Sequence, residues 1–93
     1  MSNYRISVAA EYDLTAILDY GETHFGLEQA ILFYEGLAST FDKIAKAPNL
    51  YPAVDEIKEG YRRAIYETYS IYYIQRHEFV EIARIIRKHP SVF

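Results

Sequence analysis

The stretch from Tyr61 to Lys88 constrains the fold more than any other part of the chain, because it holds three short runs of strand-forming residues with almost no chain between them. Tyr, Ile, Val, Phe and Thr are dense in it, and these side chains suit a pleated, half-buried surface better than a helix. Polar breaks at residues 67–68 and 76–78 are short enough to join only antiparallel neighbours. The stretch therefore predicts a three-stranded meander with strands at Tyr61–Tyr66, Tyr69–Gln75 and Phe79–Arg87.

Before this stretch, the apolar spacing changes from two residues to three and four. Tyr4 to Val8 alternates apolar and polar side chains, which predicts a first strand. An amphipathic helix ends at Gly26 as a left-handed stop, and its apolar positions are Ala10, Leu14, Ile17, Leu18, Gly21 and Phe25. A second helix ends at Pro48, and its apolar stripe is Leu27, Ala30, Ile31, Tyr34, Leu37, Ala38, Phe41, Ile44 and Ala45.

Two helices joined by a single glycine have to pack as an antiparallel hairpin, since nothing longer connects them. The segment from Pro48 to Gly60, with two prolines, is the long loop that leads to the meander. We therefore expect one α+β domain over residues 1–93, in the order β-α-α-β-β-β, with the helical hairpin on one face of a small antiparallel sheet. The other face of the sheet would be open.

Composition excludes several kinds of site. The 93 residues include no cysteine, which rules out disulfides, a thiolate nucleophile and a cysteine-based zinc site. The three histidines show no metal-ligand spacing, and the four glycines form no phosphate-binding motif, so we expect neither a metal nor a cofactor. No run approaches the roughly 20 apolar residues of a membrane span, which favours a cytoplasmic protein without membrane contact.

The net charge of −3 hides an asymmetry between two parts of the chain. Residues 1–57 hold three cations and nine acids, whereas residues 58–93 hold seven cations and four acids. The strand region is thus basic and the helical region acidic. This distribution suits an acidic or phosphate-bearing partner on the strand side, although the two parts could equally neutralise each other.

One stripe of the first helix is not explained by the core. Tyr12, Ala16 and Tyr20 follow each other at four-residue steps, close to opposite the side of Leu14 and Leu18. Two tyrosines on an outward stripe provide apolar area for a partner helix. The alternative is that tyrosine tolerates water through its hydroxyl group and is simply a surface residue.

With this order of elements, the sequence resembles the ParE/RelE superfamily of toxins from type II toxin-antitoxin systems, and within it ParE. The order and spacing of the residues over most of the chain carry the resemblance, and no single motif does. The residues are Ala10, Asp13, Leu14, Ile17 and Tyr20, then Gly26, Gln29, Ala30, Tyr34, Leu37, Phe41 and Ile44 to Pro48, then Gly60 to Arg62, Tyr72, Tyr73 and Ile82 to Ile86.

The resemblance implies a toxin that a cognate, ParD-like antitoxin holds inactive in a hetero-oligomer. ParE toxins are similar in acting on DNA gyrase, whereas RelE toxins cleave mRNA on the ribosome, so the fold alone does not choose between the two functions. We expect a gyrase inhibitor that is not itself an enzyme and meets nucleic acid only indirectly. The alternatives are a RelE-like mRNA interferase and a toxin-fold interaction module without activity.

Metal-free RNA cleavage needs a general base, a general acid and cations around the phosphate. The chain has no tyrosine after Tyr73, and His89 is its only late group that titrates near neutral pH. The resemblance therefore favours target contact over catalysis, through the open sheet face and the basic C-terminal segment. The residues expected to make this contact are Arg62, Arg84, Arg87, Lys88 and His89.

Each of these residues also has a purely structural interpretation. Arg84 shares strand parity with Ile82 and Ile86, so it could be a partly buried arginine paired with a carboxylate. Residues 87–89 could form a solvated tail. Arg62 could brace the preceding loop, with Asp55 or Glu56 as its partner.

Overall fold

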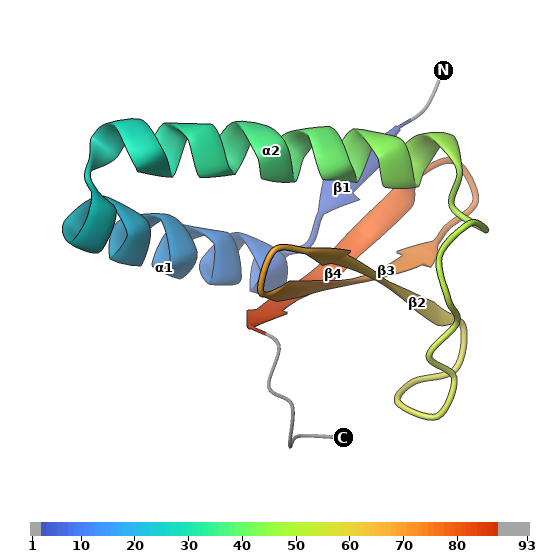
Figure 1. Cartoon of the computed structure of the whole chain (residues 1–93). Helices are drawn as coiled ribbons and strands as arrows, with labels where there is room; N and C mark the ends of the chain where they lie inside the picture. The colour runs from blue at the N-terminus through green and yellow to red at the C-terminus, as the bar shows by residue number, and fades with distance from the viewer. Residues whose placement is uncertain (1–2, 88–93) are drawn as a thin grey trace.

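The computed structural model describes residues 3–87 and has the predicted order of elements (Figure 1). The elements are β1 (Tyr4–Ile6), α1 (Val8–Phe25), α2 (Leu27–Lys46), β2 (Tyr61–Tyr66), β3 (Tyr69–Gln75) and β4 (Val80–Arg87). The α+β fold class is therefore confirmed, and the bounds of β2 and β3 agree with the predicted strands.

Two strand ends differ from the prediction. The last strand begins at Val80 rather than Phe79, and the first ends at Ile6 rather than Val8. Ser7 ends the first strand because its hydroxyl group caps α1, accepting a hydrogen bond from the backbone nitrogen of Ala10 at 3.0 Å. The same hydroxyl donates to the carbonyl oxygen of Ala83 at 2.9 Å. Ser7 thus joins the start of α1 to the last strand.

The sheet has the strand order β1-β4-β3-β2. β2, β3 and β4 form the predicted antiparallel meander, but β1 pairs with β4 in parallel, so the sheet is mixed and not antiparallel throughout as we expected. β1 covers only the first half of the outer edge of β4, through Ile82. The second half of that edge faces α1, which begins directly after β1.

A β-bulge in β4 changes which side chains share a face. Tyr73 pairs with Ile82, but the preceding Tyr72 pairs with Arg84, so Ala83 is an extra residue. The insertion reverses the alternation after it, as a bulge does. Ile85 is consequently buried, whereas Arg84 is exposed. The predicted shared parity of Arg84 and Ile82 is therefore wrong.

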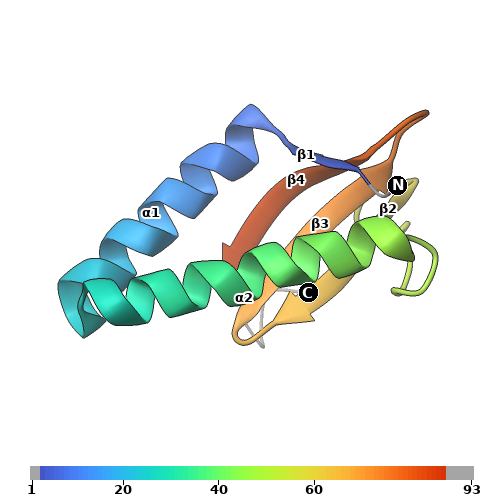
Figure 2. The same ribbon diagram turned by 90° about the horizontal axis from the view of Figure 1, so that it is seen from above.

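The two helices pack against the sheet and run in opposite directions from Gly26, as predicted, with α2 across one face and α1 along the outer edge of β4 (Figure 1). Figure 2 shows that they diverge from this corner, which projects beyond the end of the sheet. Gly26 is not the left-handed stop that we expected, because its φ of 92° is combined with a ψ of 161°. Only glycine adopts that extended, positive-φ conformation at low cost, and it reverses the chain within one residue.

The core lies where α2 crosses the sheet. Leu37, Phe41 and Ile44 are buried against strand residues such as Ile71, Tyr73 and Ile82. The predicted stripe of α2 was too wide, since Leu27, Ile31 and Tyr34 are exposed. These three belong to the half of α2 nearer to Gly26, where Phe33 is the side chain that packs against the sheet.

The long loop packs along the outer edge of β2. Ala53 forms an isolated antiparallel bridge with Arg62, and the backbone nitrogen of Val54 donates to the carbonyl oxygen of Tyr61 at 2.8 Å. Within residues 3–87, no helix is long and apolar enough to cross a membrane.

Candidate functional site

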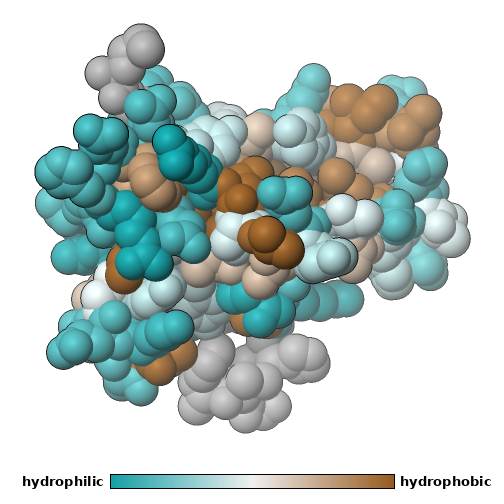
Figure 3. All heavy atoms as spheres, turned by 180° about the vertical axis from the view of Figure 1, so that it is seen from behind, coloured by the Kyte–Doolittle hydropathy of each residue, from teal (hydrophilic) through white to brown (hydrophobic). Residues whose placement is uncertain are grey.

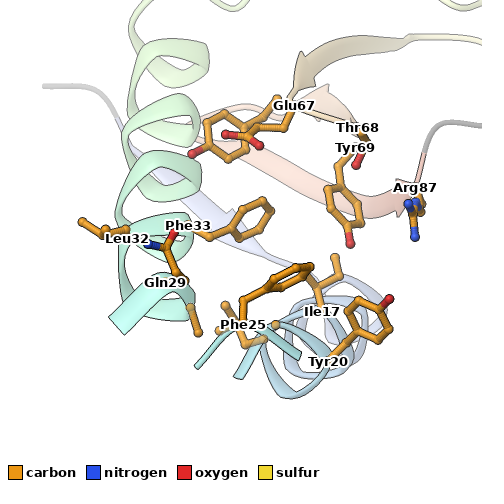
Figure 4. Close-up of a pocket in the computed structure, with 14 residues that line it drawn as sticks. Ile17, Tyr20, Phe25, Gln29, Leu32, Phe33, Glu67, Thr68, Tyr69 and Arg87 are labelled. Atoms are coloured by element: carbon orange, nitrogen blue, oxygen red, sulfur yellow. The ribbon is translucent and has the colours of Figure 1, made fainter. Parts of the chain in front are cut away.

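A groove of about 520 Å³ opens between the diverging helices and the turn that joins β2 to β3 (Figure 4). α1 and α2 form two walls, the β2–β3 turn forms the third, and the end of β4 reaches its rim. The side chains labelled in Figure 4 are Ile17, Tyr20, Phe25, Gln29, Leu32, Phe33, Glu67, Thr68, Tyr69 and Arg87.

Aromatic contacts hold the β2–β3 turn against α2. The ring of Phe33 lies 5.3 Å from that of Tyr66 and 5.5 Å from that of Tyr69, measured between centroids. Tyr66 reaches the backbone of α2 at Gly36, where any Cβ atom would overlap its ring. Burial, and then the charge of Glu67, raises the pKa of Tyr66, so its hydroxyl group stays neutral at physiological pH. The rings of Phe33, Tyr66 and Tyr69 therefore form a packed aromatic surface, with Glu67 as the charged residue of the turn.

The rim of the groove exposes large apolar side chains. Phe25 is 67% exposed and Leu32 is 53% exposed, although both belong to regular helices. Figure 3, which views the molecule from behind, shows apolar atoms gathered at the end where the two helices meet. Contiguous apolar surface next to a concave site is typical of a binding surface. The groove is therefore a candidate surface for contact with a partner.

Arg87 lies at the junction of two hollows. It lines the groove and also a shallower hollow of about 340 Å³ between α1 and the end of β4, which Asp13, Ala16 and Arg84 line as well. Its side chain is exposed and makes no hydrogen bond or ion pair with any residue between 3 and 87. This predicted contact residue is therefore available to a partner, but at the groove rather than at the open sheet face.

Arg84, by contrast, is committed to Asp13. Its Nε and Nη2 atoms donate to the two carboxylate oxygens at 2.7 Å and 3.0 Å, and the backbone nitrogen of Ile85 donates to the same carboxylate at 2.9 Å. Burial raises the pKa of Asp13, but the hydrogen bonds from Arg84 and Ile85 and the charge of Arg84 outweigh it, so the pKa is lowered overall. The alternative that Arg84 pairs with a carboxylate is confirmed, although its side chain is 50% exposed.

Arg62 forms a hydrogen bond with the long loop, as its structural interpretation predicted, but the acceptor is not the expected one. Its Nη1 atom donates to the carbonyl oxygen of Tyr51 at 2.6 Å rather than to Asp55 or Glu56. Asp55 instead accepts from the backbone nitrogen of Gly60 at 2.9 Å. The strand partner of Arg62 is Tyr73, and both residues brace the same loop. Arg62 thus contributes little positive charge to the open sheet face.

The predicted outward stripe of α1 is exposed. Tyr12, Ala16 and Tyr20 all face solvent, with Tyr12 75% exposed. Tyr20 stacks on His24 with 3.9 Å between ring centroids, and it lines both hollows together with Arg87. The structure therefore brings together Tyr20, which was predicted to contact the antitoxin, and Arg87, which was predicted to contact the target.

Sequence reasoning missed the α2 and β2–β3 walls of the groove. The wide apolar stripe of α2 was a signal for a second contact surface. Packing one helix face on the core does not need Leu27, Ile31 and Tyr34, which are exposed. Asp13 was named only among the residues that carry the family resemblance, and its bond with Arg84 was not predicted because it spans 71 positions of sequence. Lys88 and His89 lie outside the described residues. Among residues 3–87 there is no cluster of three acids or histidines suited to a metal.

The fold is similar to a known toxin-antitoxin structure. A solved chain described as the chromosomal ParDE TA system from P. aeruginosa superimposes with a TM-score of 0.82, covering 96% of this chain and 98% of that chain at 21% sequence identity. At this identity the likeness supports the fold alone.

The sequence comparisons go further. Residues 4–89 match the family model described as ParE toxin of type II toxin-antitoxin system, parDE. Toxin ParE1 of Caulobacter vibrioides is 32% identical over 88 residues, which covers 95% of this chain and 91% of the relative. Toxin ParE1 of Mycobacterium tuberculosis is 27% identical over 92 residues, covering 98% and 94%. The chain therefore belongs to the ParE toxin family and is a ParE-type toxin of a type II toxin-antitoxin system.

Proposed function

We propose that this ParE-type toxin inhibits DNA gyrase by binding to it, without being an enzyme, and that a ParD-like antitoxin holds it inactive. The match to the ParE family over nearly the whole chain is the observation that carries the proposal. Action on gyrase would place the toxin in the cytoplasm. Contact with nucleic acid would then be made by gyrase and not by the toxin.

The hydrogen bonds that two of the predicted arginines already make support binding over RNA cleavage. Cleavage without a metal would need arginine side chains directed at one phosphate, together with a group that transfers protons. Arg62 and Arg84 are instead held by bonds within the fold. Burial raises the pKa of Tyr73 to about 12, and its hydroxyl group donates to the carbonyl oxygen of Pro48, so it is a poor general base at neutral pH.

The antitoxin contact has two adjacent parts. The stripe of Tyr12, Ala16 and Tyr20 offers an exposed helical surface, and the groove beside Tyr20 offers a concave apolar one. An amphipathic segment of the antitoxin can bury its apolar face against both. Such binding would cover the exposed apolar side chains that the free toxin leaves in water.

The test of the target is a supercoiling assay with purified gyrase and plasmid. We expect the toxin to inhibit supercoiling and to accumulate cleaved plasmid, and prior mixing with the antitoxin to prevent both effects. If saturating toxin produces neither effect, gyrase is not the target. Codon-positioned cuts in mRNA on translating ribosomes would instead identify an interferase.

A further inference from the structure

The groove has an uneven charge distribution at its rim. Among its lining residues between 3 and 87, Arg87 is the one cation and Glu67, in the β2–β3 turn, is the one acid. In the adjacent hollow, Asp13 and Arg84 neutralise each other through their two hydrogen bonds. Among residues 3–87, neither Glu67 nor any other acid forms an ion pair with Arg87, so Arg87 carries a positive charge without a described partner where the two hollows meet.

This charge limits what can occupy the groove. An occupant that fills the space between Phe25, Phe33 and Tyr69 and extends to the rim reaches Arg87, because all four side chains line the same groove. Removing an unpaired guanidinium group from water is costly unless a carboxylate replaces the water. An occupant with only apolar side chains would therefore bind less tightly, because nothing would offset the free energy of removing Arg87 from water. An occupant with an acidic side chain at the Arg87 rim would form a charge-assisted pair.

We propose that the antitoxin neutralises this toxin by placing apolar side chains in the groove and a carboxylate on Arg87. The inference rests on the proposed function, in which Arg87 is a contact to the target. The antitoxin would then neutralise the toxin directly, because it covers Arg87, the side chain that contacts the target. The bulge in β4 makes this possible, since it directs Ile85 and Arg87 toward the side of the helices.

The test measures binding of the antitoxin encoded beside the toxin to the wild type and to Arg87→Gln, in low and high salt. We expect Arg87→Gln to bind about tenfold more weakly in low salt, since a hydrogen-bonded charge pair is lost. The wild type should lose affinity as salt rises, and the variant should lose much less. In the gyrase assay without antitoxin, Arg87→Gln should also be a weaker inhibitor.

Arg76→Gln is the matched control. Arg76 follows β3 at the opposite end of the sheet from the β2–β3 turn, and it pairs with Glu81 rather than with the groove. It should bind the antitoxin as tightly as the wild type. Phe25→Ser should weaken binding equally in both salt conditions, because it removes apolar contact and no charge. Circular dichroism and thermal unfolding establish that each variant is folded.

The outcomes separate the inference from the proposed function. Equal affinity and equal salt dependence of the wild type and Arg87→Gln would overturn the pairing of Arg87 with a carboxylate, whatever gyrase does. Weaker antitoxin binding with full inhibitory activity would overturn direct covering of a target contact. A wild-type toxin that binds the antitoxin but leaves gyrase unaffected would refute the target alone. Absence of any binding to the antitoxin would refute both the proposed antitoxin and this inference.

Discussion

Replacing Asp13 tests whether one carboxylate holds α1 against the last strand. Its side chain accepts hydrogen bonds from the backbone nitrogen of Ile85 and from two nitrogen atoms of Arg84. β1 does not reach this part of β4, so Asp13 supplies the acceptor that a neighbouring strand would otherwise provide. We expect Asp13→Ala to destabilise the fold and Asp13→Asn to destabilise it less.

The magnitude follows from the burial of each partner. Ile85 is 2% exposed, and a buried backbone N–H group without an acceptor costs about 1–3 kcal/mol. The side chain of Arg84 is 50% exposed, so the loss of its ion pair adds only about 0–1 kcal/mol. Asp13→Ala should therefore lower the free energy of unfolding by about 1–4 kcal/mol. In Asp13→Asn the amide oxygen can still accept from Ile85, so the loss should be about 1 kcal/mol.

Urea unfolding followed by circular dichroism measures these differences. Asp19→Asn is a matched control, because Asp19 is an exposed acid on the same helix that bonds to no other described side chain. It should change the free energy of unfolding by less than about 0.5 kcal/mol. The reasoning fails if Asp13→Ala is no less stable than this control, or if Asp13→Asn is as unstable as Asp13→Ala.

The same carboxylate should make stability depend on pH. The pKa of Asp13 is lowered in the folded chain, so its contribution is fully present above 3.8, the ordinary value for this group. It is lost as the pH falls through the lower, folded pKa. The difference in stability between wild type and Asp13→Asn should thus be full at pH 7 and shrink in acid. A difference that stays constant below pH 3.8 would contradict the assigned bonds.

Two further substitutions test the parts that support the site. Tyr73→Phe removes the hydrogen bond from the hydroxyl group to the carbonyl oxygen of Pro48, and should lower the free energy of unfolding in urea by about 1 kcal/mol. An unchanged stability would show that this bond does not anchor the loop. Gly36→Ala would gain about 1 kcal/mol from helix propensity alone, but its Cβ atom overlaps the ring of Tyr66. We expect a lower melting temperature and weaker antitoxin binding, and a higher melting temperature would refute the close contact.

Local patterns were sufficient for most of the fold. β-branched and aromatic side chains marked β2 and β3 at their observed ends, because a two-residue turn leaves no freedom in how the strands pair. The three- and four-residue spacing of apolar side chains marked both helices for the same local reason. The exposure of Tyr12, Ala16 and Tyr20 followed from their helical spacing alone.

The candidate site was harder to predict, because it depends on contacts between distant residues. Strand parity misplaced Arg84, since the bulge at Ala83 arises from pairing with β3 and not from the residues of β4 themselves. Arg62 was recognised as a possible brace, but its partner is a backbone carbonyl group, which every residue has and no sequence pattern marks. The groove exists because the helices diverge from Gly26 and leave Phe25 and Leu32 without cover.

The sequence by itself therefore determined the order of elements, the fold class and the membership of the ParE family, because these depend on local periodicity and on spacing along the chain. Only the tertiary structure decided which arginine is available. Three candidates with the same side chain differ because Arg62 bonds to the loop and Arg84 bonds to Asp13, whereas Arg87 is left at the rim of the groove. The distinction depends on partners 11 and 71 positions away, which only the packing of the folded chain brings within hydrogen-bond distance.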